Sequence, residues 1–126
     1  MNITSRDDAL TGEPMDSSHF NGPVTSHPLH TSEEPHPVRV SVVHFQPGIR
    51  NHWHHHAGGQ VLHVVDGEGY VQSRGEEVRL IRTGDTVSAA PGEQHWHGAG
   101  PDAAMSHVAV SIGETTWLEP SELDAI

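Results

Sequence analysis

The stretch QVLHVVDGEGYVQSRGEEVRLIRTGDTVSAA, residues 60–90, decides the fold class of this chain. Short β-branched runs with alternating polarity indicate strands, and here they are QVLHVVD, GYVQS, EVRLIR and DTVSAA. The turn signals DGEG, SRGE and TGD separate them. On either side of this stretch, the same pattern of short β-branched runs predicts further strands at VRVSVVHF (38–45) and MSHVAVSI (105–112).

Strands this short and this regularly spaced, with no amphipathic helical stretch between them, are typical of an antiparallel sandwich or barrel. The predicted fold class is therefore all-β. A chain of 126 residues is the size of one domain. We expect an extended, partly disordered N-terminal arm at residues 1–36, a β-barrel at 37–118 and a short C-terminal tail at 119–126.

The composition excludes several partners and chemistries. The formal net charge is −11, and all six Lys+Arg residues are arginine, so we expect neither nucleic acid nor an anionic membrane as a partner. Without lysine there is no Schiff base, and without cysteine there is no thiolate nucleophile, disulfide or iron–sulfur cluster. No apolar run approaches the roughly 20 residues of a membrane span, and Met1–Leu10 does not resemble a signal peptide. We therefore predict a cytoplasmic protein.

A histidine-rich segment, NHWHHHAGGQ at residues 51–60, suggests half of a metal site. On a strand, His54 and His56 point to one side and His55 to the other. Gln60 could bring an amide oxygen to the same point across the glycine turn. A further ligand has to come from elsewhere in the chain, and HWH at 95–97 offers either of its two histidines.

Two spacings in the chain resemble the motifs of the cupin family. Gly48, five residues, His54-His55-His56, three residues, Gln60, six residues and Gly67 resemble the first cupin motif, G-x5-H-x-H-x3-E-x6-G, with Gln in place of Glu. The stretch from Gly84 to His95 is similar to the second motif. Within the family the chain looks most like small single-domain cupins that include manganese-dependent bacterial hydroxynitrile lyases.

The resemblance implies a single cupin (jelly-roll) β-barrel that holds one divalent transition metal per chain. The implied ligands are His54, His56, Gln60 and His95. Manganese is the metal of that group, while Fe, Zn, Ni and Co also suit imidazole and amide ligands. A neutral Gln leaves the site one formal charge more positive than the usual Glu, which favours binding an anion or polarising a carbonyl.

Two further histidines are candidate catalytic residues. His107 corresponds to a residue near the metal in the lyase-like group, and it is a candidate general base or a buried structural residue. His97 shares the parity of His95, and for it a structural role is the preferred interpretation. The alternate positions Met105, His107, Ala109 and Ser111 should line one face of their strand, with Ser111 as a small liner of the pocket.

The predicted function is a metal-dependent lyase that acts on a small-molecule substrate, reversibly cleaving a cyanohydrin to an aldehyde and cyanide. An iron-dependent dioxygenase, an isomerase or cyclase, and a non-catalytic cupin that binds a metal or small ligand are the alternatives. Exposed sheet edges need covering, so we also expect a homodimer or homotetramer.

Overall fold

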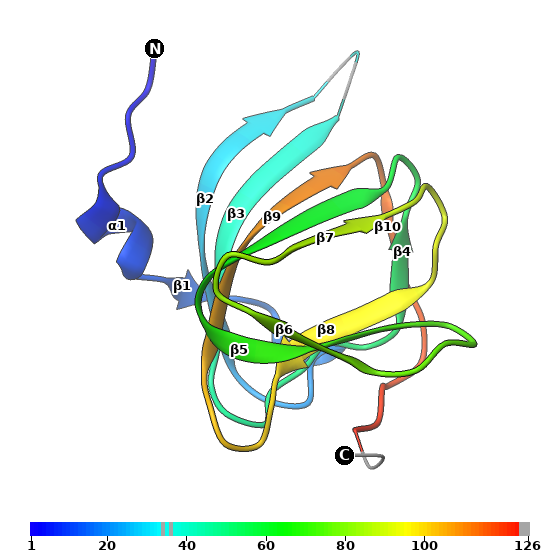
Figure 1. Cartoon of the computed structure of the whole chain (residues 1–126). Helices are drawn as coiled ribbons and strands as arrows, with labels where there is room; N and C mark the ends of the chain where they lie inside the picture. The colour runs from blue at the N-terminus through cyan, green and yellow to red at the C-terminus, as the bar shows by residue number, and fades with distance from the viewer. Residues whose placement is uncertain (34, 36, 124–126) are drawn as a thin grey trace.

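The structure is a computed structural model that describes residues 1–33, 35 and 37–123, and its regular structure is almost entirely antiparallel β-strand (Figure 1). The prediction of an all-β fold is thereby confirmed. In chain order the elements are α1 Arg6–Leu10, β1 Glu13–Pro14, the 3-10 turn η1 Ser17–His19, β2 Val24–Ser32, β3 Val38–Phe45, β4 His54–His56, β5 Gln60–Ser73, β6 Arg79–Arg82, β7 Thr86–Ala89, β8 His95–Ala99, β9 Met105–Ile112 and β10 Thr115–Trp117.

The strands pair in the order β1-β2-β3-β9-β5-β8-β4-β10, with β6 and β7 also paired to β5. The sheet curls, so that β2, β3 and β9 lie on one side of the molecule and β4 and β10 on the other (Figure 1). The buried core lies between these sides and includes Phe45, Leu62, Val64 and Met105. This is the jelly-roll barrel that the sequence predicts.

Strand β5 corrects one sequence-based expectation. The segment DGEG at 66–69 was expected to form a turn between two strands, but β5 runs unbroken from Gln60 to Ser73. The register against β9 shifts between Val64 and Asp66, and Gly67 has φ +77°. A positive φ at glycine is typical of a β-bulge as well as of a turn. Here the bulge lets β5 pass from partners β9 and β7 to partners β8 and β6.

Both ends of the chain contact the barrel. β2 lies inside the segment predicted as an arm and pairs with β3 along its length. Further toward the N-terminus, Phe20 forms an isolated bridge with Asn51. β10 pairs with β4 at the other end of the chain, while residues 124–126 of the predicted tail lie outside the described residues.

No helix in the described part of the chain is long and apolar enough to span a membrane.

The alternation of β3 and β9 places their inward side chains in rows across the sheet. Arg39 pairs with Ser111, Ser41 with Ala109, and Val43 with His107. His107, Ala109 and Ser111 all line the interior cavity, as the parity of the strand predicts. This face of the sheet forms one wall of the site.

Candidate metal centre and cavity

Strand β4 presents His54 and His56 to the interior, where they are 1% and 4% exposed. His54 lies opposite His95 across the pairing of β4 with β8. The ring centroid of His54 lies 5.1 Å from that of His56 and 4.4 Å from that of His95. The structure therefore brings the three predicted histidine ligands together from two neighbouring strands.

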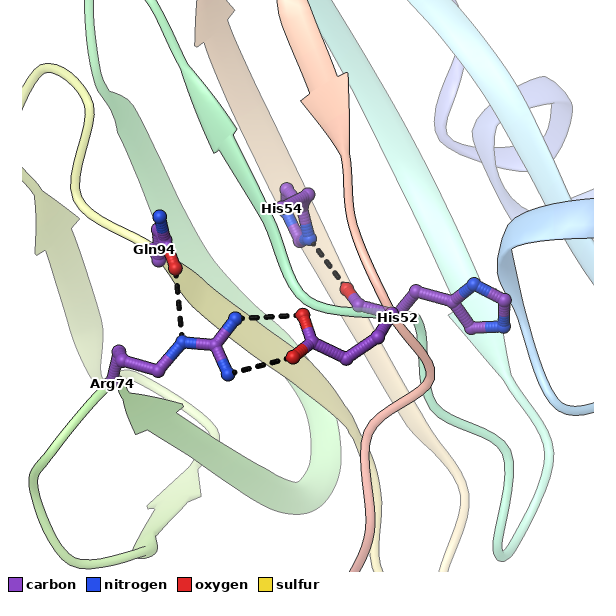
Figure 2. A network of polar contacts seen from close by, with 5 residues as sticks. His52, His54, Arg74 and Gln94 are labelled. Carbon is purple, nitrogen blue, oxygen red and sulfur yellow. Dashed lines mark hydrogen bonds and ion pairs between the residues drawn. The ribbon is translucent and has the colours of Figure 1, made fainter.

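Each of these imidazoles is oriented by a hydrogen bond at Nδ1. His54 Nδ1 lies 2.8 Å from the His52 carbonyl, as Figure 2 shows. His95 Nδ1 lies 2.9 Å from the Glu93 carbonyl, and His56 Nδ1 lies 2.9 Å from Thr115 Oγ1. With Nδ1 occupied, the Nε2 atom of each ring is left to bind a metal, which is the usual arrangement of metal-binding histidines.

Gln60 is oriented in the same way. Its Nε2 donates to Ser111 Oγ at 2.9 Å, which turns Oε1 inward to 2.9 Å from His95 Nε2. Gln60 is 5% exposed, so its amide oxygen faces the imidazoles and not water. A carbonyl oxygen among imidazole nitrogens is a donor set that divalent transition metals accept.

The buried polar atoms fit a metal at this place. His56 Nε2 is buried and has no hydrogen-bond partner among the described residues. An unpaired buried nitrogen is costly in a protein interior, and a metal ligand bond removes that cost. His54, His56, Gln60 and His95 are thus the residues that would hold the ion.

His97 lies close to this set, because nitrogen atoms of His54, His95 and His97 are all within 4.8 Å of one another. Distance alone would allow His97 as a ligand in place of His56. Both ring nitrogens of His97, however, are hydrogen-bonded to residues outside the proposed ligand set, namely Asn51 and His107, whereas His56 Nε2 has no partner among the described residues. The hydrogen bonding therefore favours His56.

The imidazoles are held in the neutral form that binds metals. Burial, followed by the neighbouring His95, lowers the pKa of His54 to about 3. The same two causes lower the pKa of His56 to about 4, and burial also lowers the pKa of His95. No proton has to leave these rings near neutral pH before an ion binds.

Asn51, His97 and His107 form a buried hydrogen-bonded chain next to the metal ligands. The backbone N–H of His97 donates to Asn51 Oδ1 at 2.9 Å, so the amide nitrogen of Asn51 faces His97 Nε2 at 3.1 Å. An amide nitrogen only donates, hence His97 Nε2 accepts and the proton of the neutral ring is on Nδ1. His97 Nδ1 then donates to His107 Nε2 at 3.0 Å.

This chain assigns the tautomers of both histidines. His107 Nε2 accepts, so its proton lies on Nδ1, which is buried and has no hydrogen-bond partner in the part of the chain that the structure describes. Burial lowers the pKa of His97 well below its ordinary range and that of His107 to about 4, so both rings are neutral. The side-chain amide of Asn51 therefore sets the direction of every hydrogen bond in this three-residue network. Nothing in the sequence pattern singled Asn51 out.

The site opens into a cavity of about 410 Å³, a size typical of small-molecule sites. Its wall includes an apolar group of side chains, namely Phe20, Val43, Phe45 and Trp117. It also includes a polar group, namely Arg39, Ser41, Ser111 and Thr115. The alternation of VRVSVVHF does not identify Arg39 and Ser41, because it places valines at 38, 40 and 42 on one face and would turn the two polar side chains outward. The structure turns Arg39 and Ser41 toward the cavity.

The remaining histidines of the central segments lie outside the ligand set. His55 points away from His54 and His56 and is half-buried, and His52 contributes only its carbonyl. His63 is exposed and hydrogen-bonds to Thr86 Oγ1 at 2.8 Å. His19, which carried no signal in the sequence, lines the cavity and stacks on Trp117 with 4.5 Å between ring centroids.

A barrel with inward-facing histidines from its two central motifs defines a class of metal-binding β-barrels. Residues 41–111 match the cupin domain model, and the chain belongs to the cupin family. Over 91 residues it is 45% identical to an (R)-mandelonitrile lyase of Granulicella tundricola, covering 72% of this chain and 70% of that protein.

Two solved structures show the same architecture. A cupin-like protein of Thermotoga maritima is 38% identical with a TM-score of 0.82, covering 95% of this chain and 90% of that one. An acetylacetone dioxygenase of Acinetobacter johnsonii has a TM-score of 0.76 and 17% identity, covering 94% and 78%. The second likeness concerns the fold alone.

Proposed function

We propose that this protein is a metal-dependent lyase of the hydroxynitrile lyase type, which reversibly cleaves a cyanohydrin into an aldehyde and cyanide. The observation that carries the proposal is the neutral set of three imidazoles and one amide oxygen beside a cavity with an apolar wall. The 45% identity to an (R)-mandelonitrile lyase supports the same reaction.

The four ligands leave all the positive charge of a divalent ion uncompensated. When bound, the metal would supply Lewis acidity, which polarises a substrate oxygen and attracts an anion. A glutamate at position 60 would cancel one unit of that charge, whereas Gln60 does not. Manganese is our proposed metal.

Cleavage requires a base for the hydroxyl proton of the cyanohydrin. We assign this role to His107 Nε2. The lone pair of this nitrogen is not hydrogen-bonded to Asn51, and in the free protein it accepts from His97 Nδ1. The substrate hydroxyl takes the place of His97 as the donor, and its proton passes to His107. The C–O bond becomes a carbonyl, the bond to the nitrile carbon breaks, and cyanide leaves with the electron pair.

The cavity wall suits a substrate with an aromatic or bulky apolar group. Phe20, Phe45 and Trp117 offer ring faces and edges on which such a group can pack. A substrate group packed on this wall also displaces water from around the reacting atoms, which strengthens each hydrogen bond made to them.

The test is cleavage of racemic mandelonitrile by protein reconstituted with manganese, measured as benzaldehyde release at acidic pH, where the background reaction is slow. His54→Ala is the matched control. We expect release well above background for the wild type and background for the variant. Equal rates of benzaldehyde release for the two proteins would exclude the proposed reaction.

A dioxygenase is the second candidate from the sequence, and oxygen consumption separates it from the lyase. Consumption by the ferrous form, but not by the manganese or zinc forms, would favour it. Tight ligand binding without turnover, unchanged in His107→Ala, would favour a binding protein.

The homodimer or homotetramer and the cytoplasmic location stay predictions from the sequence.

A further inference from the structure

Arg39 lies in a row of side chains that leads to the metal ligands. Its Cα pairs with that of Ser111 across β3 and β9, and Ser111 pairs with Gln60 across β9 and β5. Adjacent strands are about 4.8 Å apart, so Arg39 is roughly 10 Å from Gln60 along the sheet. All three residues line the cavity. The guanidinium is therefore within one small substrate's length of the site.

Among the described residues, the charge of Arg39 has no acidic partner within ion-pair distance. Three of the other arginines, Arg6, Arg74 and Arg82, form ion pairs, and Arg50 donates to the Ser121 carbonyl. Within residues 1–33, 35 and 37–123, no carboxylate lies within 4.0 Å of the Arg39 guanidinium. Glu33 and Glu114 line a neighbouring surface cavity with Arg39, yet neither reaches it.

The position of Arg39, and not the lack of an ion pair alone, sets it apart from the other arginines. Arg79 also has no ion pair among the described residues, but it does not line this cavity. Arg39 borders the cavity that His54, His56 and Gln60 also line. A guanidinium in such a position offers two parallel N–H donors, which match a carboxylate.

Two hydroxyls lie on the same wall as Arg39. Ser111 Oγ accepts from Gln60 Nε2, which leaves the Ser111 hydroxyl hydrogen free to donate. Ser41 is half-buried on the same strand as Arg39 and two residues away, so both side chains face the cavity. A guanidinium and two hydroxyls together form a donor-rich wall that contrasts with the aromatic group.

We propose that Arg39, Ser41 and Ser111 form a subsite for a carboxylate on the substrate, remote from the reacting carbon. The cleavage of such a substrate rests on the proposed lyase function, whereas the binding of its carboxylate does not. The preferred substrate is then a cyanohydrin, or its aldehyde, that carries both an aromatic body and an acid group. The carboxylate is held by Arg39 while the carbonyl end reaches the metal ligands.

The test compares 4-formylbenzoate with its neutral methyl ester as ligands of the full-length, manganese-loaded protein, by isothermal titration calorimetry. Wild-type protein should bind the acid roughly tenfold or more tightly than the ester, since a charge-assisted hydrogen bond contributes about that much. Arg39→Gln should abolish the preference, and Arg39→Lys should retain part of it.

Arg79→Gln is the matched control, because Arg79 is exposed on β6, has the same charge and does not line this cavity. It should keep the full preference. Equal binding of acid and ester by the wild type, or equal losses in the two glutamine variants, would overturn the subsite. Arg39 is itself exposed, so its replacement should leave the melting temperature unchanged.

Cleavage assays with the cyanohydrins of the two aldehydes separate this inference from the proposed function. If neither is cleaved but the Arg39-dependent preference in binding persists, the lyase reaction is wrong and the subsite stands. If both are cleaved with the same KM in wild type and Arg39→Gln, the reaction stands and the subsite is wrong.

Discussion

Replacing Asn51 with aspartate reverses one hydrogen bond in a buried chain while hardly changing its shape. The Asn51 amide accepts from the backbone of His97 and donates to His97 Nε2. A carboxylate can still accept the first hydrogen bond but cannot donate the second. In Asn51→Asp, His97 must therefore protonate Nε2 and, while neutral, offer Nδ1 as an acceptor. His107 Nε2 then carries a hydrogen and donates to His97.

The expected fall in kcat follows from the loss of the acceptor lone pair on His107 Nε2. In the wild type His107 Nε2 is an acceptor, and in Asn51→Asp it has no lone pair to receive the substrate proton. A positioned general base contributes about 10²- to 10⁴-fold to a rate, so kcat should fall by at least about 100-fold. The metal content should not change, since none of the four ligands hydrogen-bonds to Asn51.

Two measurements test this reasoning. Nitrogen-15 NMR of histidine-labelled, zinc-loaded protein at slightly alkaline pH reports which ring nitrogen of His107 carries hydrogen, and kcat comes from the manganese form. We expect His107 protonated on Nδ1 in the wild type and on Nε2 in Asn51→Asp. A wild type already protonated on Nε2 refutes the tautomer assignment. An inverted tautomer with unchanged kcat refutes His107 as the base.

Three further changes test the site and the fold. His54→Ala should lose bound metal by elemental analysis, because it removes a ligand from the centre of the set; full retention of the ion would contradict the assignment. Gly67→Ala places a Cβ against the Ala104 carbonyl oxygen, and should lower the free energy of unfolding in urea by clearly more than Gly75→Ala, which has a similar φ but open space. The ion pair of Arg74 with Glu119 is exposed and screened by solvent, so Glu119→Ala should barely move the urea midpoint, whereas Arg74→Ala also removes the contact with the Trp53 ring and the hydrogen bond to Gln94 and should lower the midpoint further.

The β-branched runs bounded by turn signals were predictable from the sequence. VRVSVVHF and MSHVAVSI became β3 and β9 with the same bounds, although β3 buries both Val42 and Val43 and so does not alternate strictly. The segment DGEG was not, because a glycine with positive φ serves a turn and a bulge equally well. Only the partners of β5 on both sides distinguish the two, and they come from distant parts of the chain.

The proposed metal ligands were accessible to sequence reasoning because they lie in two short motifs. The chain of Asn51, His97 and His107 was not, since it joins a loop residue to β8 and β9 and leaves no spacing signal. Nor did the sequence indicate that His19 lines the cavity, because η1 reaches the site only through the return of the N-terminal segment to the barrel.

The match to the family covers residues 41–111, whereas the walls of the cavity extend beyond it on both sides. Phe20 and Arg39 precede the matched segment, and Trp117 follows it. A protein trimmed to the family boundaries would keep all four proposed metal ligands and lose much of the cavity wall. Related chains can therefore share one metal chemistry yet differ in what they accept, through changes confined to their two ends.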